Sequence, residues 1–462
     1  MSNSIKLAIL GLGTVGTGVI NLINDNLNEL KRRSGRDIII TEVGTRRQRD
    51  DIDPNIIQNS DLMATAASDN VDIVIEVIGG TTLAKDVIMH AIKNGKHVVT
   101  ANKALLAEHG NEIFAFAEQH QVHVAYEAAV AGGIPIIKVM REALAANKVE
   151  WLAGIINGTG NFIMTEMRDK GRPFADVLSE AQELGYAEAD PTFDVEGIDA
   201  AHKLALLASI AFGIPLQFDK VYCEGITGIT LQDVNYAEEL GYRIKHLGFA
   251  VRRDGQGNAD NAGIELRVHP TLIPQDALLA NVNGVKNAVL VNSHPLGQTL
   301  YCGDGAGAGA TASAVMADVM DLVRVLGSKD NDDQSSGDQN SSDQNNTNQN
   351  NKGHHVPHLA FIPEQLSDTP ILRAEQMTTG YYLRVHAYDS PGVLADITRI
   401  LSDAGINIDA ILQKPAHKAG EVPVIILTLP VVESQMNLAI EKIEKLDTIT
   451  DKVVRIRLDE LA

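Results

Sequence analysis

Cysteine and aromatic residues are scarce in this chain: its 462 residues include two cysteines and one tryptophan, and 4% are aromatic. Cys223 and Cys302 are too few for a disulfide framework and lack the spacing of metal ligands, so a disulfide-rich secreted domain is excluded. No window reaches the roughly 20 uninterrupted apolar residues of a membrane-spanning helix. The N-terminus has no signal-peptide pattern. We therefore expect a cytoplasmic protein.

Positive charge is also in deficit, because the chain carries 39 Lys and Arg against 60 Asp and Glu, a formal net charge of −21. Such a chain repels phosphate backbones and anionic membranes, which argues against nucleic-acid or lipid binding. The 44% of hydrophobic and 21% of charged residues are ordinary for globular proteins. The length predicts about three domains.

Short apolar runs alternate with helical patterns in the first third of the chain. The runs lack polar alternation, as is typical of strands that helices cover on both faces. This order predicts an α/β fold, with a doubly wound parallel sheet of the Rossmann type over residues 1–145. The expected strands are residues 5–10, 38–43, 71–78, 97–100 and 122–125.

The pattern changes after this sheet to longer strands mixed with long helices, which predicts a mixed α+β substrate and dimerisation domain over residues 146–303. Its expected elements include strands at 150–156 and 263–269 and a helix at 197–212. A glycine-rich entry then suggests that the chain returns to the first domain over residues 304–327.

Three further segments complete the chain. Residues 328–356 are almost wholly polar, which predicts a disordered linker, because no large apolar residue offsets the entropy of ordering. A connecting segment over residues 357–379 follows. Residues 380–462 show a βαββαβ order, which predicts a ferredoxin-like module.

The strongest nucleotide motif directly follows the first strand and opens a helix. In this context the first glycine permits a tight turn, the second lets backbone approach a pyrophosphate, and the third allows close helix packing. The helix N-terminus attracts phosphates. We therefore expect dinucleotide binding, although a purely structural turn is the alternative. The motif is Gly11, Leu12, Gly13, Thr14, Val15 and Gly16.

The end of the second strand favours NADP(H) over NAD(H). Arg46 follows this strand where NAD-binding proteins carry an acid, and a guanidinium suits a 2′-phosphate. The alternative is that Arg46 and Arg47 simply solvate a loop, and Glu42 lies close enough to leave NAD(H) open. Thr100 and Lys103 follow a later strand, at the edge where ligands of open parallel sheets bind. Lys103 is thus a site candidate, or alternatively a surface lysine.

The densest cluster of chemical groups runs from Gly185 to Lys203 and includes the acids Glu188, Asp194 and Asp199. Asp199 and Lys203 are four residues apart, so they project from one helical face. The helix around them is apolar almost all round and should be buried. A buried lysine needs an acidic partner or loses its charge, and both conditions suit acid/base catalysis. A surface ion pair is the alternative.

Together these motifs resemble homoserine dehydrogenase, in its monofunctional form without a kinase, over nearly the whole chain. The resemblance rests on residues 11–16, 100–103, 127–135, 157–161 and 188–203. It implies NAD(P)H-dependent reduction of L-aspartate 4-semialdehyde to L-homoserine, a step toward threonine, methionine and isoleucine. It also implies a homo-oligomer, dimeric or tetrameric.

The family's roles transfer by motif to several residues. Lys203 resembles the general acid and Asp199 the residue that orients it and binds substrate, while Lys103 matches a lysine near both nicotinamide and substrate, which leaves the principal proton donor open. Glu188 matches the residue that holds the substrate amino group, and Asp194 lies in the same polar site. Gly185 and Gly303 match residues of the loops that close over the cofactor in this family.

The resemblance implies two further sites. The family's monovalent-cation site, for an ion such as Na⁺, matches Glu127 and the backbone carbonyls of Val130, Gly132 and Ile134. The C-terminal module resembles an ACT domain, which implies feedback control by L-threonine. Effector candidates there are Asp389, Gly392 and Asn407.

Two rival functions stay open at this point. A semialdehyde dehydrogenase of the same pathway would need an activated cysteine nucleophile, and neither cysteine lies in such a motif. A non-catalytic amino-acid sensor would retain the nucleotide fold as scaffold, and it would not need the buried Asp199–Lys203 pair.

Overall fold

The structure is a computed structural model that describes residues 4–255, 262–335, 356–414 and 420–461. The chain divides into two compact units, each of which is described by itself. Unit 1 comprises Met1–Lys148, Ala205–Phe218 and Gly303–Asp368, and unit 2 comprises Val149–Leu204, Asp219–Cys302 and Thr369–Ala462. Within the described residues, no helix is long and apolar enough to cross a membrane.

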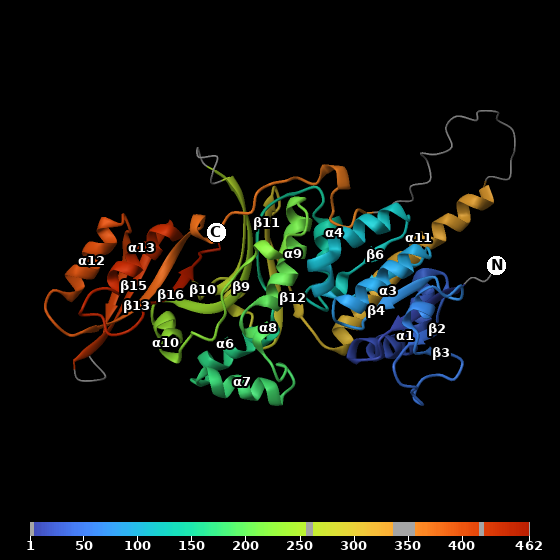
Figure 1. Ribbon diagram of the computed structural model, residues 1–462, viewed down its shortest axis with the longest axis horizontal. Helices are drawn as coiled ribbons and strands as arrows, with labels where there is room; N and C mark the ends of the chain where they lie inside the picture. The colour runs from blue at the N-terminus through green and yellow to red at the C-terminus, as the bar shows by residue number, and fades with distance from the viewer. Residues whose placement is uncertain (1–3, 256–261, 336–355, 415–419, 462) are drawn as a thin grey trace. The chain divides into compact units, whose positions relative to one another are not determined.

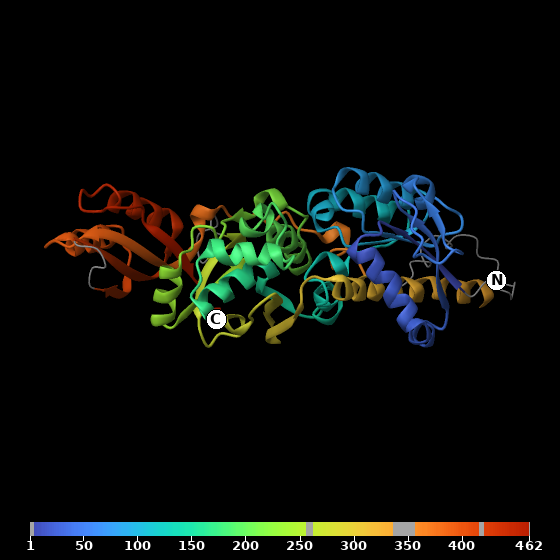
Figure 2. The ribbon, with the colours of Figure 1, turned by 90° about the horizontal axis from the view of Figure 1, so that it is seen from below.

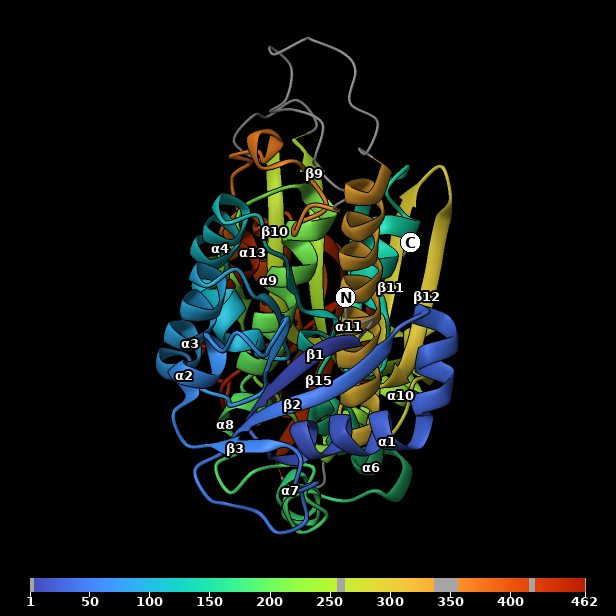
Figure 3. The same cartoon turned by 90° about the vertical axis from the view of Figure 1, so that its right-hand side faces the viewer.

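Unit 1 contains a six-stranded, wholly parallel sheet in the order β3-β2-β1-β4-β5-β6. Figure 3 shows its neighbouring strands β3, β2 and β1. This confirms the expected doubly wound architecture, although the short edge strand β3 was not foreseen. The strands are β1 (Ser4–Leu10), β2 (Asp37–Gly44), β3 (Ile57–Asn59), β4 (Ile73–Glu76), β5 (His97–Thr100) and β6 (Val124–Ala125).

Helices cover both faces of this sheet, which is why its central strands are almost fully apolar and buried. Figure 2 shows α1 and α11 side by side on one face, with the blue and cyan helices α3 and α4 on the other. The helices are α1 (Thr14–Ser34), α2 (Leu62–Ala66), α3 (Thr82–Lys93), α4 (Lys103–Gln119), the short α5 (Ile136–Lys138) with the π-helical turn Val139–Ala143, and α11 (Ala308–Ser335).

Helix α11 brings the chain back to unit 1, where Ala312, Val315 and Val319 join the apolar core under β1. The helix runs to Ser335, so the expectation of disorder was wrong for residues 328–335. Each residue added to an existing helix gains a hydrogen bond without a new nucleation cost, so the long apolar helix extends into polar sequence. Residues 336–355 of the expected linker lie outside the described residues.

Unit 2 is built on one ten-stranded sheet, in the order β12-β11-β7-β9-β10-β16-β13-β15-β14, with β8 paired to β10. Its substrate-domain strands are β7 (Lys148–Ile155), β8 (Tyr222–Cys223), β9 (Tyr242–Asp254), β10 (Ala262–Pro274), β11 (Lys286–His294) and β12 (Gly297–Asp304). The accompanying helices are α6 (Gly158–Lys170), α7 (Phe174–Glu183), α8 (Thr192–Val195), α10 (Leu231–Glu239) and α9 (Ile198–Phe212), of which the part up to Leu204 belongs to this unit.

The C-terminal part has the expected βαββαβ order, with α12 and α13 packed together over its strands (Figure 1). Its elements are β13 (Thr378–Tyr388), α12 (Val393–Asp403), β14 (Ile408–Gln413), β15 (Glu421–Val432), α13 (Glu433–Ile443) and β16 (Val454–Leu458). Strand β16 pairs with β10 as well as with β13, so this module continues the substrate-domain sheet. The sequence did not predict this fusion of two expected domains.

Candidate functional site

A cavity of about 1050 Å³ lies at the carboxyl edge of the unit 1 sheet, where β1 and β2 end. Parallel sheets bind ligands at this edge. The size suits a dinucleotide, which needs an extended groove and not a closed pocket. Its walls include Gly11, Leu12, Gly13, Gly44, Thr45, Arg46, Arg47, Gln48, Arg49, Val77, Ile78 and Gly79.

Gly11, Leu12 and Gly13, the first half of the glycine motif, line this cavity. Gly11 has a φ of +101°, and a Cβ there would lie 2.6 Å from the Val77 carbonyl oxygen. A Cβ on Gly16 would lie 2.0 Å from the Gly11 carbonyl oxygen. These two glycines therefore permit the turn and the close helix packing. Thr14, Val15 and Gly16 form the first turn of α1 and do not line the cavity.

Three arginines, Arg46, Arg47 and Arg49, line the cavity beyond β2. Arg49 was missed by sequence reasoning; its Nη1 donates to the Leu12 carbonyl oxygen at 3.0 Å and so fastens the glycine loop. Its pKa is raised by the hydrogen bond to Asp51. Glu42, which left NAD(H) open, is 6% exposed, accepts a hydrogen bond from Ser68 and is not part of the cavity wall.

The ends of β4 and β5 are held together by Glu76, which is fully buried. Its carboxylate accepts hydrogen bonds from Thr100 Oγ1 at 2.6 Å and from the Ile78 amide at 2.8 Å, while burial raises its pKa. Thr100 therefore shapes this sheet edge from within. Lys103 is the first residue of α4, which Asn102 caps.

The predicted acid and lysine pair is buried at the start of α9, in unit 2. Asp199 is 8% and Lys203 9% exposed. Lys203 Nζ donates to Asp199 Oδ2 at 2.7 Å and to the Ile156 carbonyl oxygen, just beyond β7, also at 2.7 Å. The surface ion-pair alternative is therefore wrong, because both residues are buried and two acceptors hold the Lys203 amine.

Asn157 joins this pair to Asp194, a contact that sequence reasoning did not assign. The Asn157 side chain caps α6 through the Gly160 amide at 2.7 Å, and its Nδ2 donates to Asp194 Oδ1 at 2.7 Å and to Asp199 Oδ2 at 2.9 Å. The position of Asn157 in the 157–161 segment, which resembles the family, was the signal in the sequence that could have identified it as a site residue. We call Asn157, Asp194, Asp199 and Lys203 the acid–lysine cluster.

Two other predicted residues of this unit lie outside the acid–lysine cluster. Glu188 is exposed, and its backbone carbonyl accepts a hydrogen bond from Nε2 of the Gln182 side chain. Gly185 has a φ of +75° and follows the end of α7, where it lets the chain turn. Both belong to the loop that leads from α7 to α8.

The predicted cation segment is buried in unit 1. Both Glu127 carboxylate oxygens accept amide hydrogen bonds, from Ile137 and Lys138 at 2.8 Å each, and its own amide donates to Asp318 of α11 at 2.7 Å. Burial raises the pKa of Glu127 to about 7 and that of Asp318 to about 8. A bound positive ion would stabilise the charged form of these buried carboxylates. No side-chain cluster with metal-ligand geometry occurs among the described residues.

The remaining residues of this segment are backbone features. Val130, Gly132 and Ile134 are buried, and Gly132 has a φ of +49°. A Cβ on Gly303 would lie 3.1 Å from Ile134 Cγ1, so Gly303 packs against the same loop. Backbone carbonyls in such a loop suit a hard cation.

A cavity of about 360 Å³ lies at the start of α12. Asp389 and Gly392 line it, together with Ser390 and Gln413. Asn407, the third predicted effector residue, is not part of its wall; its backbone carbonyl accepts the Leu429 amide at 2.9 Å. The cavity has the size of a small polar molecule.

Comparison with known proteins identifies the family of this chain. The family profile described as "Homoserine dehydrogenase" matches residues 135–320, its "NAD binding domain" matches residues 11–127, and "ACT domain" matches residues 381–448. Similar proteins include homoserine dehydrogenases of Pseudomonas aeruginosa, 55% identical over 459 residues, and of Neisseria gonorrhoeae, 48% identical over 460 residues, with 99% of each chain covered.

A similar solved structure is a homoserine dehydrogenase from Thiobacillus denitrificans, with a TM-score of 0.89, 52% identity and 99% coverage of both chains. These matches span the catalytic, nucleotide-binding and C-terminal parts alike, which decides against a semialdehyde dehydrogenase. The chain therefore belongs to the homoserine dehydrogenase family, the oxidoreductases that interconvert L-aspartate 4-semialdehyde and L-homoserine with a nicotinamide cofactor.

Proposed function

We propose that the acid–lysine cluster performs the proton transfer of this reaction, with Lys203 as the proton donor and Asp199 as the group that orients it. The observation that supports this is the buried Lys203 amine, directed by two acceptors at 2.7 Å. A buried, hydrogen-bonded lysine is held in one geometry, which is what a general acid needs.

The proposed mechanism balances one hydride and one proton. When bound, the reduced nicotinamide supplies the hydride to the aldehyde carbon. Lys203 transfers a proton from Nζ to the carbonyl oxygen as negative charge develops there, so the product is the primary alcohol. Asp199 stabilises the protonated amine before transfer, and Asn157 fixes Asp199. In reverse, the neutral amine accepts the hydroxyl proton. Glu188 and Asp194 would bind the substrate amino group.

Replacement of the lysine tests this role. Lys203→Met should lower kcat by about 100-fold or more, within the range of general acid/base catalysis, while NADPH titration gives an unchanged Kd. Lys170→Ala, on an exposed side chain of the same unit, is the matched control and should turn over normally. Lys103→Met distinguishes the two candidate donors. If Lys103→Met loses more kcat than Lys203→Met, the assignment is reversed.

We also propose that NADP(H) is the preferred cofactor, because arginines and not an acid line the cavity beyond β2. Arg46 would bind the 2′-phosphate, while Thr100 and Lys103 would approach the nicotinamide end and Gly185 and Gly303 would belong to loops over the cofactor. Arg46→Ala should raise KM for NADPH about 10-fold, because one charge-assisted contact with the 2′-phosphate is lost. It should leave KM for NADH unchanged. Equal effects on both cofactors would remove Arg46 from this role.

The buried Glu127 segment fits a monovalent cation, and we propose Na⁺ with the carbonyls of Val130, Gly132 and Ile134 as ligands. The ion would supply charge that stabilises the loop. Exchange of Na⁺ for choline at constant ionic strength should lower Tm, and Glu127→Gln should reduce that difference. An unchanged Tm would count against the site.

We further propose that the cavity at α12 binds an amino-acid effector, L-threonine, and that the protein acts in the cytoplasm as a dimer or tetramer. Asp389 and Gly392 would bind the effector there; Asn407 would stabilise the neighbouring strand. Asp389→Ala should abolish inhibition of homoserine oxidation by threonine and leave uninhibited kcat unchanged. Inhibition that persists in this variant would exclude this cavity.

A further inference from the structure

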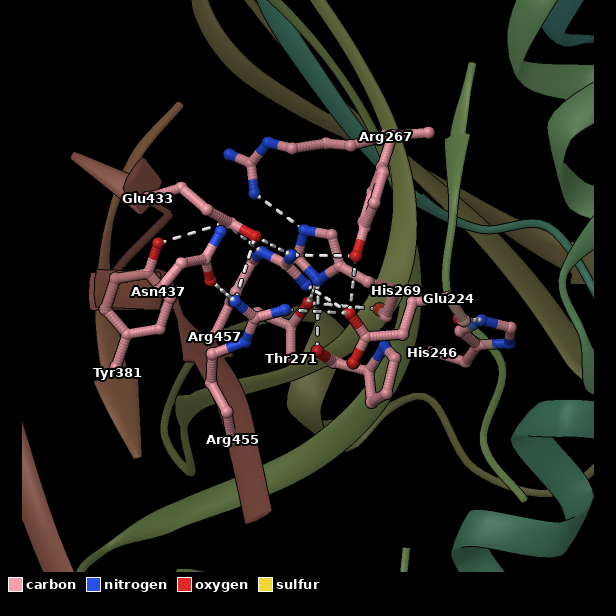
Figure 4. A network of polar contacts seen from close by, with 12 residues as sticks. Glu224, His246, Arg267, His269, Thr271, Tyr381, Glu433, Asn437, Arg455 and Arg457 are labelled. Atoms are coloured by element: carbon pink, nitrogen blue, oxygen red, sulfur yellow. Dashed lines mark hydrogen bonds and ion pairs between the residues drawn. The ribbon is translucent and has the colours of Figure 1, made fainter. Parts of the chain in front are cut away.

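A buried polar network occupies the junction where β16 of the ACT domain meets β10 of the substrate domain (Figure 4). The two strands are parallel, with Arg457 opposite Thr271 and Leu458 opposite Leu272. Ile456 of β16 and Ile163 of α6 also share one apolar core. The last strand of the ACT domain is therefore a structural part of the substrate domain.

Arg457 is the branch point of this network. Its side chain is 0% exposed, and its guanidinium contacts acids from both domains. On the ACT side, Nε donates to Glu433 Oε2 at 2.8 Å, at the first residue of α13. On the substrate-domain side, Nη1 donates to Glu224 Oε2 at 2.7 Å, and Nη2 donates to the Tyr222 hydroxyl at 3.0 Å. A rigid, planar fork suits such a double contact.

Glu224 begins a short segment, residues 224–227, that leads from this fork to α9. The Glu224 carbonyl oxygen accepts a hydrogen bond from His246 Nε2 at 3.0 Å. The His246 ring packs on Gly197, where a Cβ would lie 3.1 Å from His246 Cε1. Gly197 directly precedes α9, so the ring fixes where this helix begins.

The same segment also holds the backbone that enters α9. The Ile226 amide donates to the Val195 carbonyl oxygen at 2.9 Å, and Thr227 Oγ1 donates to Glu196 Oε1 at 3.2 Å. Val195 ends α8, and α9 begins three residues later, at Ile198. Segment 224–227 is thus bound to the ACT domain through the Glu224 side chain, and to the residues just before α9 through the Ile226 backbone and the Thr227 side chain.

We propose that Arg457 and His246 are positioning residues: they transmit the placement of the last ACT strand to the N-terminus of α9, and so to Asp199 and Lys203. This rests on the proposed catalytic role of the acid–lysine cluster. Movement of a catalytic group by about 1 Å can cost as much as 100-fold in rate. A shift of β16 would therefore change turnover without any contact between the ACT domain and the reacting groups.

A second buried ion pair provides a matched control. Arg384 of β13 binds Asp233 through Nε at 2.7 Å and Nη2 at 3.0 Å, and it too joins the ACT domain to the substrate domain. These bonds end on the first turn of α10 and not on the residues before α9. Loss of this pair should weaken the same domain junction while the entry to α9 keeps its contacts.

The test compares Arg457→Met with Arg384→Met in the full chain, at a temperature well below both Tm values. We expect Arg457→Met to lower kcat about 10-fold or more, with KM for NADPH unchanged. Arg384→Met should lower Tm comparably and keep kcat within about 2-fold. If Arg457→Met does not fold, Glu224→Gln decides, because it keeps the Arg457–Glu433 pair and weakens the contacts of the Glu224 carboxylate with Arg457, Tyr222 and Arg455.

The proposal is overturned if Arg457→Met, or Glu224→Gln in its place, loses no more kcat than Arg384→Met. Lys203→Met, measured alongside, distinguishes failure of the proposed catalytic role from failure of the positioning role. Normal turnover of Lys203→Met would remove the proposed catalytic role. Loss of turnover in Lys203→Met, with none in Arg457→Met or Glu224→Gln, would remove only the positioning role.

Discussion

Gly13 offers a test that separates nucleotide binding from folding. Its φ of −80° is accessible to any residue, and among the described residues no atom beyond its two chain neighbours lies within 4 Å of a Cβ built there. Gly13→Ala should therefore fold as well as the wild type, with a change in unfolding free energy within about 0.5 kcal/mol. The added methyl group projects where the pyrophosphate is expected. Overpacking of this kind costs about 1–3 kcal/mol, which weakens NADPH binding about 5- to 150-fold.

The assay pairs urea unfolding with fluorescence titration of NADPH. Gly16→Ala is the matched control, because its Cβ would lie 2.0 Å from the Gly11 carbonyl oxygen and must displace α1. We expect Gly16→Ala to lose about 1–3 kcal/mol of unfolding free energy or more. NADPH binding of wild-type strength by Gly13→Ala would refute the placement of the pyrophosphate at this loop.

Two further predictions concern stability. Burial lowers the pKa of His246 to about 4, so the unfolded chain binds this proton more tightly and stability is lost as pH falls from 6.5 toward 4. The loss approaches about 3 kcal/mol; urea unfolding of His246→Asn should show a flatter pH dependence, and an equal slope would count against burial as the cause. Asp233→Ala leaves Arg384 buried without its carboxylate, and it should cost about 3–5 kcal/mol. A loss below 1 kcal/mol would show that the guanidinium reaches solvent.

The local patterns of the chain were enough to predict most of the elements and to point to Gly11 and Lys203 as candidate site residues. Gly11, with its positive φ, and Lys203, on an apolar helix, each carry a local constraint that the sequence exposes. Asn157 was harder to assign, because its side chain contacts acids 37 and 42 residues away. Arg49 likewise acts on a loop 37 residues earlier. Pairings of this range depend on the tertiary fold, which periodicity does not encode.

The fusion of the ACT domain with the substrate domain shows why domain boundaries are the weakest part of such predictions. The βαββαβ order identifies the module, yet nothing in the apolar alternation of β16 distinguishes a sheet edge from a strand with neighbours on both sides. The distinguishing residues are Arg457 and Arg384, charged side chains on strands that would otherwise be ordinary core. Both are buried because acids face them: Glu224 of the substrate domain together with Glu433 of the ACT domain for Arg457, and Asp233 of the substrate domain for Arg384.

This shared sheet also decides how regulation should be tested. Removal of the ACT domain would strip Tyr382, Leu427 and Ile456 from an apolar core that includes Ile163 and Met164 of α6. A truncated chain would lose turnover through damage to the substrate domain, whether or not an effector site had been removed. Point substitutions avoid this ambiguity. Asp389 changes the cavity without touching the junction, and Arg457 changes the junction without touching the cavity, so the two variants separate effector binding from its transmission to α9.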